Sequence, residues 1–249
     1  MGQVKFKVAK KLDMTSNWFL QRIQMLFGLN SSEIKPSHLK SVLKLSNLEG
    51  CEVSMIDGGA NVGEFTDALL KVVPNLSGLC VEPQHALVDV LKKKFDKTNI
   101  KCLTVGIGIH NGTANLYLIE EGDRKASLVH ERKGTISQEI KILTLEEIIT
   151  SEMPAGVNLI KLDLEGYDSL VLDQYFRSSH ERLPSVLILE ISYLSNSTGF
   201  TPRKTFQMLN ENGYNSIFRT SPYFGLIPLE ISNIRDFEGH TVNWIAIHD

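Results

Sequence analysis

Five short apolar runs, separated by longer stretches with helical periodicity or loop character, constrain the fold of this chain more than any other feature. Each run is too short for an average helix, and most are rich in Val, Ile and Leu, which is typical of strands buried on both faces of a parallel sheet. The stretches between the runs are long enough to serve as crossovers. The sequence therefore predicts a doubly wound α/β sheet, with parallel strands at residues 53–57, 78–82, 101–107, 158–163 and 186–191.

Other short runs predict further strands. The sequence around Gly112 indicates a turn that leads into an extra strand, and residues 139–143 indicate another strand before a helix that begins TLEEII. Near the C-terminus, residues 214–219 and 241–248 form apolar runs with no long helical pattern between them. We expect these two runs to form an antiparallel pair at the edge of the sheet.

The first fifty residues differ in character from the rest of the chain. The first 48 hold eight basic and two acidic side chains, a net charge of +6, whereas the whole chain of 249 residues carries −3. Apolar residues at helical spacing predict one amphipathic helix within 14–30 and a second within 36–48. We therefore expect a basic N-terminal helical extension, residues 1–50, that docks on a main domain, residues 51–249. Its charge also allows a weak contact with an anionic partner.

The segment MIDGGANVGE, residues 55–64, is the most informative for function. A predicted strand ends at Asp57, Gly58 and Gly59 permit a tight turn, and Gly63 lets the next helix pack closely. The glycines do not form the Gly-x-Gly-x-x-Gly pattern that holds the pyrophosphate of a dinucleotide. Because a carboxylate at Asp57 would repel phosphate, it favours a cationic nucleoside such as S-adenosylmethionine.

Two later segments place more polar groups at strand ends. Glu82 ends the second predicted strand, where an acidic side chain can accept hydrogen bonds from ribose hydroxyls, a device that NAD enzymes share. Lys161, Asp163 and Glu165 alternate with leucines, so an extended chain places them on one face. Three unpaired charges inside a sheet would cost several kcal/mol. We therefore expect them at the carboxyl end of the strand, facing a ligand cleft.

DGGANVG, VEP, LTLEEI and IKLDLEGYDSLVL, in this order and spacing, resemble the FkbM-type methyltransferases over residues 53–191. The resemblance implies a Rossmann-like, seven-stranded, mostly parallel sheet with an antiparallel edge strand, and S-adenosyl-L-methionine as the cofactor. Asn61 departs from the general D-x-G-x-G-x-G pattern of methyltransferases, but Asn tolerates a left-handed backbone. The resemblance leaves residues 1–50 and the C-terminal part uncovered, so it does not identify the methyl acceptor.

The resemblance also implies roles for particular residues. The glycine turn would frame the methionine moiety, the VEP segment would hold the ribose, and the end of the third strand would flank the adenine. The candidate cofactor-binding residues are Asp57, Gly59, Ala60, Asn61, Gly63, Glu82, Pro83, Gly106, Ile107 and Asp163. Because known members methylate hydroxyl oxygens, the resemblance implies O-methylation of a hydroxyl on a small molecule, sugar or glycan.

Methyl transfer from a sulfonium is an in-line displacement, and a hydroxyl acceptor benefits from a base. Asp163 or Glu165 is the first candidate for this catalytic role, either as base or as a group that orients the acceptor, and Asp163 serves equally well as a cofactor contact. His110, just beyond the third predicted strand, is the best placed histidine. Spacing alone supports no metal site.

Two alternatives remain open from the sequence: an NAD-dependent oxidoreductase, and a noncatalytic S-adenosylmethionine-binding module. The acidic main domain disfavours nucleic acid as a partner, and no apolar run reaches the roughly 18 residues of a membrane-spanning helix. The three separated cysteines, Cys51, Cys80 and Cys102, suit a reducing compartment. We therefore expect a cytoplasmic protein, and a homodimer is compatible with the sequence.

Overall fold

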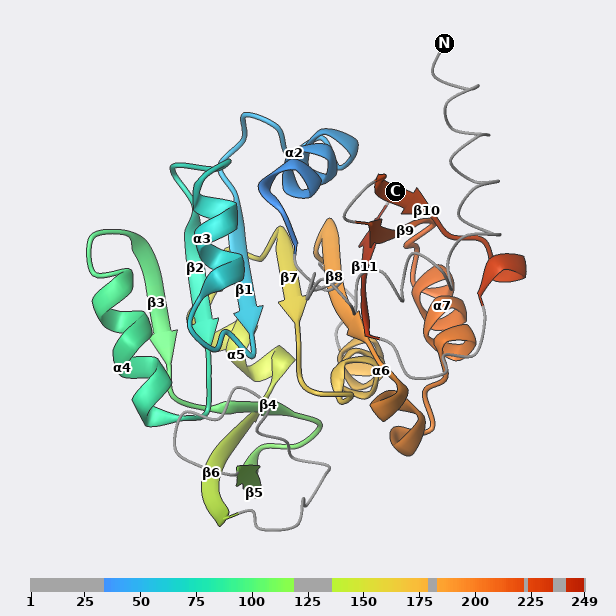
Figure 1. Cartoon of the computed structure of the whole chain (residues 1–249). Coiled ribbons are helices and arrows are strands. Elements are labelled where there is room, and N and C mark those ends of the chain that lie inside the picture. Colours follow the sequence, from blue (N-terminus) through green and yellow to red (C-terminus); the bar gives the residue numbers. More distant parts are fainter. Residues whose placement is uncertain (1–33, 119–135, 179–182, 222–223, 235–240, 249) are drawn as a thin grey trace, which may run out of the picture.

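The computed structural model describes residues 34–118, 136–178, 183–221, 224–234 and 241–248 (Figure 1). The expected helix within residues 14–30 lies outside these ranges. Within them, a large sheet is covered by helices on both faces, and a small sheet lies at one end (Figure 1). No helix of the described ranges is long and apolar enough to cross a membrane.

The large sheet has eight strands in the order β10-β9-β11-β8-β7-β1-β2-β3. Five neighbouring strands of this order are mutually parallel, namely β8, β7, β1, β2 and β3. This confirms the predicted doubly wound sheet. Its central strands β1, β7 and β8 are buried almost throughout, as Val-, Ile- and Leu-rich parallel strands are. The strands are β1 (Ser54–Gly58), β2 (Ser77–Val81), β3 (Asn99–Leu103), β7 (Leu159–Leu162), β8 (Val186–Ile191), β9 (Ser216–Ser221), β10 (Gly225–Pro228) and β11 (Val242–Ile247).

The C-terminal part of the sheet differs in detail from the expected arrangement. The two predicted C-terminal strands, β9 and β11, do pair antiparallel, but β11 lies inside the sheet between β8 and β9. The edge strand is β10, which pairs antiparallel with β9 and makes the count eight rather than seven. Its four residues, GLIP, were too short to be recognised as a strand.

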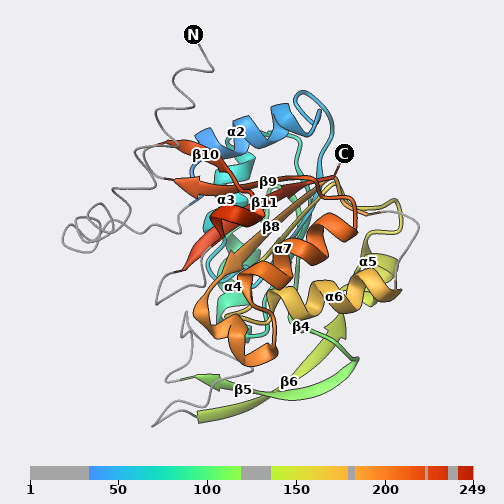
Figure 2. The same cartoon turned by 90° about the vertical axis from the view of Figure 1, so that its right-hand side faces the viewer.

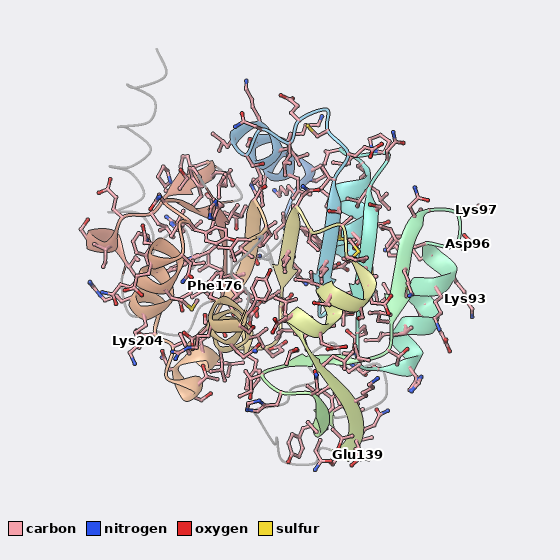
Figure 3. All side chains as sticks on the ribbon, turned by 180° about the vertical axis from the view of Figure 1, so that it is seen from behind. Lys93, Asp96, Lys97, Glu139, Phe176 and Lys204 are labelled. Atoms are coloured by element: carbon pink, nitrogen blue, oxygen red, sulfur yellow. The ribbon has the colours of Figure 1, made fainter. Side chains whose placement is uncertain are left out.

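The small sheet has the order β4-β6-β5 and consists of β4 (Gly106–Gly108), β5 (Gly112–Leu118) and β6 (Ile136–Thr144). Both extra strands predicted from the sequence are present, as β5 and β6. The single strand expected at 101–107 is instead two, β3 and β4, in different sheets. Gly106 and Gly108 allow this change, because a Cβ at either would lie within 2.6 Å of Ile142 on β6. Glu139 marks the rim of this sheet in Figure 3.

Two sets of helices cover the large sheet (Figure 2). One face packs against α2 (Pro36–Leu45), α3 (Glu64–Leu70) and α4 (His85–Lys94). The other packs against α5 (Leu145–Glu152), α6 (Asp168–Ser178) and α7 (Pro202–Glu211), and Figure 3 labels Phe176 of this core. Short 3-10 helices follow β8, as η1 (Tyr193–Thr198), and β10, as η2 (Ile231–Asn233).

Helix α2 confirms the helix expected within residues 36–48 and is an integral part of the core. Leu39 and Val42 are fully buried and belong to the same apolar cluster as the inner residues of β1 and β8. Nε2 of His38 lies 3.1 Å from the carbonyl oxygen of Ser221 at the end of β9. The helix therefore bridges the parallel and antiparallel halves of the sheet.

Candidate functional site

The turn after β1 approaches the end of β7 so closely that only glycine fits in it. Gly59 has a φ of +67°, a left-handed conformation that glycine adopts without strain. A Cβ at this position would lie 2.1 Å from the carbonyl oxygen of Asp163. The amides of Gly59 and Ala60 donate to the carbonyl oxygen of Val81 at 3.0 and 3.1 Å. The turn is therefore fixed between the carboxyl ends of β2 and β7.

Two further residues of the motif have left-handed backbones. Asn61 has a φ of +51° and Gly63 a φ of +74°, and Asn is among the few residues other than glycine that visit this region routinely. A Cβ on Gly63 would lie 2.7 Å from the ring of Phe95. Gly63 is therefore closely packed, but against Phe95, which follows α4, and not between the next helix and β1 as expected.

Glu82 follows β2 directly, and its carboxylate is buried against the turn. The residue is 5% exposed. Its Oε2 accepts a hydrogen bond from the amide of Asn61 at 3.0 Å, and its Oε1 accepts one from the amide of Gln84 at 3.1 Å. Burial raises the pKa of Glu82, and the two amides oppose the rise. Since a carboxylate oxygen can accept more than one hydrogen bond, Glu82 retains the capacity to accept from a ribose diol.

Lys161 joins the end of β7 to the turn after β1. The residue is 6% exposed, and its Nζ lies 3.2 Å from Oδ1 of Asp57 and 3.3 Å from Oδ2 of Asp163. The same ammonium donates to the carbonyl oxygen of Gly59 at 3.1 Å. The second oxygen of Asp57, which is fully buried, accepts a hydrogen bond from the hydroxyl of Thr66 at 2.8 Å. One cation therefore holds two strand ends and the glycine turn.

Burial and charge act in opposite directions in this network. Burial raises the pKa of Asp57, and the ammonium of Lys161 opposes the rise. Burial lowers the pKa of Lys161, but the carboxylates of Asp163 and Asp57 outweigh it, so the pKa lies above its ordinary value. The lysine therefore stays charged. It is shared between the buried Asp57 and Asp163, whose side chain is 39% exposed.

A pocket with about 650 Å³ of empty space, part of it open to solvent, adjoins the turn. The pocket brings together most of the residues that the sequence singled out. Its wall contains Gly59, Asn61, Glu82, Pro83, Gly106, Ile107, Asp163 and Glu165.

Four of the predicted site residues lie outside the pocket wall. Asp57, Ala60 and Gly63 are buried, and the carboxylate of Asp57 faces Lys161 and Thr66 rather than the pocket. His110 is exposed in the turn between β4 and β5. The local pattern located the strand end to within one residue, since β1 ends at Gly58, but it did not reveal that the side chain of Asp57 is turned into the protein.

Sequence reasoning missed most of the apolar wall. The additional lining residues are Val81, Gln84, Val105, Leu116, Ile140 and Leu164, of which Leu116 and Ile140 come from the small sheet. The sequence around Gly112 and at residues 139–143 predicted the strands β5 and β6. It did not predict that the buried face of these strands would close the pocket, because that contact is not local.

Two carboxyl groups that the sequence analysis did not select interact electrostatically with Asp163. Both carboxylate oxygens of Asp168 accept from the amide of Leu164 at 3.3 Å, and burial raises the pKa of Asp168 to about 7. Burial, together with the charges of Asp163, Asp168 and Glu165, raises the pKa of Glu190 to about 9. Within the described ranges, no group of three or more His, Cys, Asp or Glu residues is arranged to hold a metal ion.

Comparisons with solved structures return proteins of low sequence identity. A precorrin-6y C5,15-methyltransferase from Geobacter metallireducens has a TM-score of 0.45 and 12% identity, over 84% of this chain and 87% of its own. TrmK of M. capricolum, in complex with S-adenosylhomocysteine, has a TM-score of 0.45 and 7% identity, over 84% and 68%. A SAM-dependent O-methyltransferase from Thermotoga maritima has a TM-score of 0.42 and 10% identity, over 90% and 69%. These similarities carry no information about the acceptor of this chain.

Comparisons at the sequence level are more decisive. No curated protein matches the chain significantly. A family model of the methyltransferase FkbM domain, however, matches residues 57–216, well over half of the chain and every segment that lines the pocket. The chain therefore belongs to the FkbM methyltransferase family, and its cofactor is S-adenosylmethionine.

Proposed function

We propose that this protein is an S-adenosylmethionine-dependent O-methyltransferase that acts on a hydroxyl of a small molecule, sugar or glycan. One observation carries the proposal: a single pocket combines the buried carboxylate of Glu82, an apolar wall, and two further carboxylates, Asp163 and Glu165. The carboxylate of Glu82 and the apolar wall suit a nucleoside. The carboxylates of Asp163 and Glu165 suit an acceptor that loses a proton during the reaction.

The residues present fit the cofactor. Glu82 is held by two backbone amides, so its oxygens are oriented for the ribose hydroxyls. Ile107, Leu116 and Ile140 provide an apolar surface for the adenine. The Gly59 turn carries no side chain that would obstruct the methionine moiety. The bound cofactor supplies a methyl group on a positively charged sulfur, which makes the methyl carbon electrophilic.

The chain itself mainly aligns the two reactants and keeps water out. Positioning of this kind can supply about 7–11 kcal/mol of barrier reduction. Asp163 and Glu165 stand at the pocket wall, where a carboxylate can take the proton of the acceptor hydroxyl as its oxygen attacks. A positioned base contributes typically about 100-fold to 10,000-fold. Asp57 acts indirectly, because its buried charge holds Lys161, which in turn holds Asp163.

Glu82→Gln is expected to weaken binding of S-adenosylhomocysteine by about tenfold to hundredfold, because hydrogen bonds to a charged group are worth about 1.5–3 kcal/mol. The amide would also place a donor against the amide of Asn61 or Gln84. Isothermal titration measures the change, with the exposed Glu49→Gln as the matched control. If Glu82→Gln leaves the affinity unchanged, Glu82 does not bind the ribose. Tight binding of NADH by the unaltered protein would favour the oxidoreductase alternative.

Glu165→Gln is expected to leave the affinity for S-adenosylhomocysteine unchanged and to lower turnover by about 100-fold or more, because it keeps the shape of the side chain and removes the base. Transfer of radiolabelled methyl groups to a panel of hydroxylated small molecules and sugars measures turnover. The companion variant Asp163→Asn, measured in the same assay, shows which of the two carboxylates acts as the base. Cofactor binding without methyl transfer to any member of the panel by the unaltered protein would favour a noncatalytic binding module.

A further inference from the structure

Strand β8 contains one polar residue in an otherwise apolar sequence, VLILEI. All five of its apolar residues are buried, as expected for a central strand. Glu190 interrupts this run one residue before the strand ends, and it is only partly buried. Placing a carboxyl group there is unfavourable unless the group has a partner or a ligand.

The strand register places Glu190 on the same face of the sheet as Asp57 and Lys161, but two residues beyond the position of β8 that pairs with Lys161. Asp57 pairs with Lys161, and Lys161 pairs with Ile188, which shares a face with Glu190. Glu190 in turn pairs with Asn243 on β11. Glu190 and Asn243 therefore begin a row of polar side chains that runs from β8 towards the antiparallel half of the sheet.

Two hydroxyl groups continue this row. Ser192 has an extended backbone, with a φ of −132° and a ψ of 167°, so it lies on the same face as Glu190 two residues earlier. On β9 and β11, Phe218 pairs with Ile245. Thr220 and Asn243 each lie two residues from this pair, so both are on the same face of the sheet.

Neither hydroxyl oxygen has a hydrogen-bond partner among the residues that the structure describes. Ser192 is 2% exposed and Thr220 is 3% exposed, and a buried hydroxyl without a partner costs about 1–3 kcal/mol. Two such groups on the face that also carries Glu190 indicate a ligand that would supply the missing hydrogen bonds.

The charges around Glu190 restrict what this ligand can be. Asp163, Asp168 and Glu165 all act on Glu190 with the sign that favours a bound proton, and the opposing cation, Lys161, is already held by two aspartates. A field that disfavours a negative charge on Glu190 equally disfavours a phosphate or carboxylate on a ligand beside it. Neutral hydroxyl groups, which both donate and accept hydrogen bonds, suit the two side-chain hydroxyls and the carboxyl group.

The geometry points to Glu190, Ser192 and Thr220 as an acceptor subsite that takes a neutral, polyhydroxylated molecule and rejects anionic ones. Three neighbouring strands, β8, β11 and β9, carry this row, and two inter-strand spacings of about 4.8 Å give it a length of about 10 Å. This length suits a ligand with several hydroxyl groups, such as a mono- or disaccharide. The inference rests on the proposed O-methyltransferase function and names the surface that would hold its acceptor.

Saturation-transfer NMR on the protein loaded with S-adenosylhomocysteine tests the subsite. The probes are neutral methyl glycosides and disaccharides, together with the corresponding sugar phosphates. We expect binding of neutral probes and no binding of the phosphates. Ser192→Ala and Thr220→Val should each raise the apparent Kd of a neutral probe about tenfold, the value of one lost hydrogen bond.

Glu190 allows a sharper comparison. Glu190→Leu should abolish binding of the neutral probes, whereas Glu190→Gln should retain it, because an amide replaces a protonated carboxyl group as donor and acceptor. The exposed Glu211→Gln on α7 is the matched control and should not change binding. Titration with S-adenosylhomocysteine shows for every variant that the fold and the cofactor site are intact.

The outcomes separate this inference from the proposed function. If the unaltered protein binds S-adenosylhomocysteine but no neutral probe, or binds sugar phosphates equally well, the subsite is wrong and the methyltransferase assignment stands. The subsite is also wrong if the variants Glu190→Leu, Ser192→Ala and Thr220→Val bind the neutral probes as tightly as the control Glu211→Gln does. Failure to bind S-adenosylhomocysteine would overturn the proposed function itself.

Discussion

Lys161→Met is expected to lower the free energy of unfolding by about 3–5 kcal/mol, the usual effect of removing one member of a buried ion pair. Its ammonium lies 3.2 Å from Asp57 and 3.3 Å from Asp163, and it donates to Gly59. Methionine is of similar length but leaves the fully buried carboxylate of Asp57 without a cation. Urea unfolding at neutral pH measures the loss.

The same substitution is expected to change the ranking of cationic and neutral ligands. Asp163 lines the pocket, and without Lys161 its charge is no longer compensated. We therefore expect Lys161→Met to raise the affinity for S-adenosylmethionine, which carries a sulfonium, relative to that for S-adenosylhomocysteine, which does not. Isothermal titration of both ligands gives the ratio, which a purely structural role of Lys161 would leave unchanged.

Two further variants make the interpretation specific. Lys101→Met removes an exposed lysine that pairs with Glu152, and the loss of such a surface pair should cost no more than about 1 kcal/mol. Asp57→Asn combined with Lys161→Met should recover part of the stability, because the buried carboxylate is removed together with its cation. A loss in Lys161→Met no larger than that in Lys101→Met would contradict the role assigned to this network.

The parts of the fold that depend on local pattern could be predicted from the sequence. The parallel strands were recognisable because Val-, Ile- and Leu-rich runs such as 186–191 contrast with the intervening helical periods. The strands β5 and β6 were predicted from the sequence around Gly112 and at residues 139–143, but their association in a separate sheet was not. The split between β3 and β4 was not predicted, because it depends on how closely Gly106 packs against Ile142 on another strand.

The site shows the same limit. Glycine spacing located the turn at the pocket, and the acid at the end of β2 pointed to Glu82, which lines the same pocket. The orientation of Asp57 could not be predicted, because the cation that draws its carboxylate inward, Lys161, lies more than a hundred residues later in the chain. Glu190 was read only as part of a strand. Its significance depends on the register with Asn243 and on the carboxylates of neighbouring segments.

Glu190→Gln is expected to make the protein more stable than the unaltered chain at alkaline pH. Burial, with the charges of Asp163, Asp168 and Glu165, raises the pKa of Glu190 from 4.5 to about 9, and only Lys161 among these groups opposes the rise. Between these two pKa values the folded protein keeps a proton that the unfolded chain has released. Unfolding then releases a proton, so the contribution of Glu190 to stability is present below pH 4.5 and declines as pH rises towards 9.

One proton corresponds to a loss of about 1.4 kcal/mol per pH unit across this window. Glutamine does not titrate, so the free energy of unfolding of Glu190→Gln relative to the unaltered protein should rise at up to about that slope between about pH 6 and about pH 8. Urea unfolding at several pH values measures the difference, in which the titration of Asp168 and other shared groups largely cancels. Glu211→Gln serves as the control. A difference for Glu190→Gln that stays flat over this range would mean that the carboxyl group is already ionised in the folded protein, and the neutral character inferred for the acceptor subsite would then be wrong.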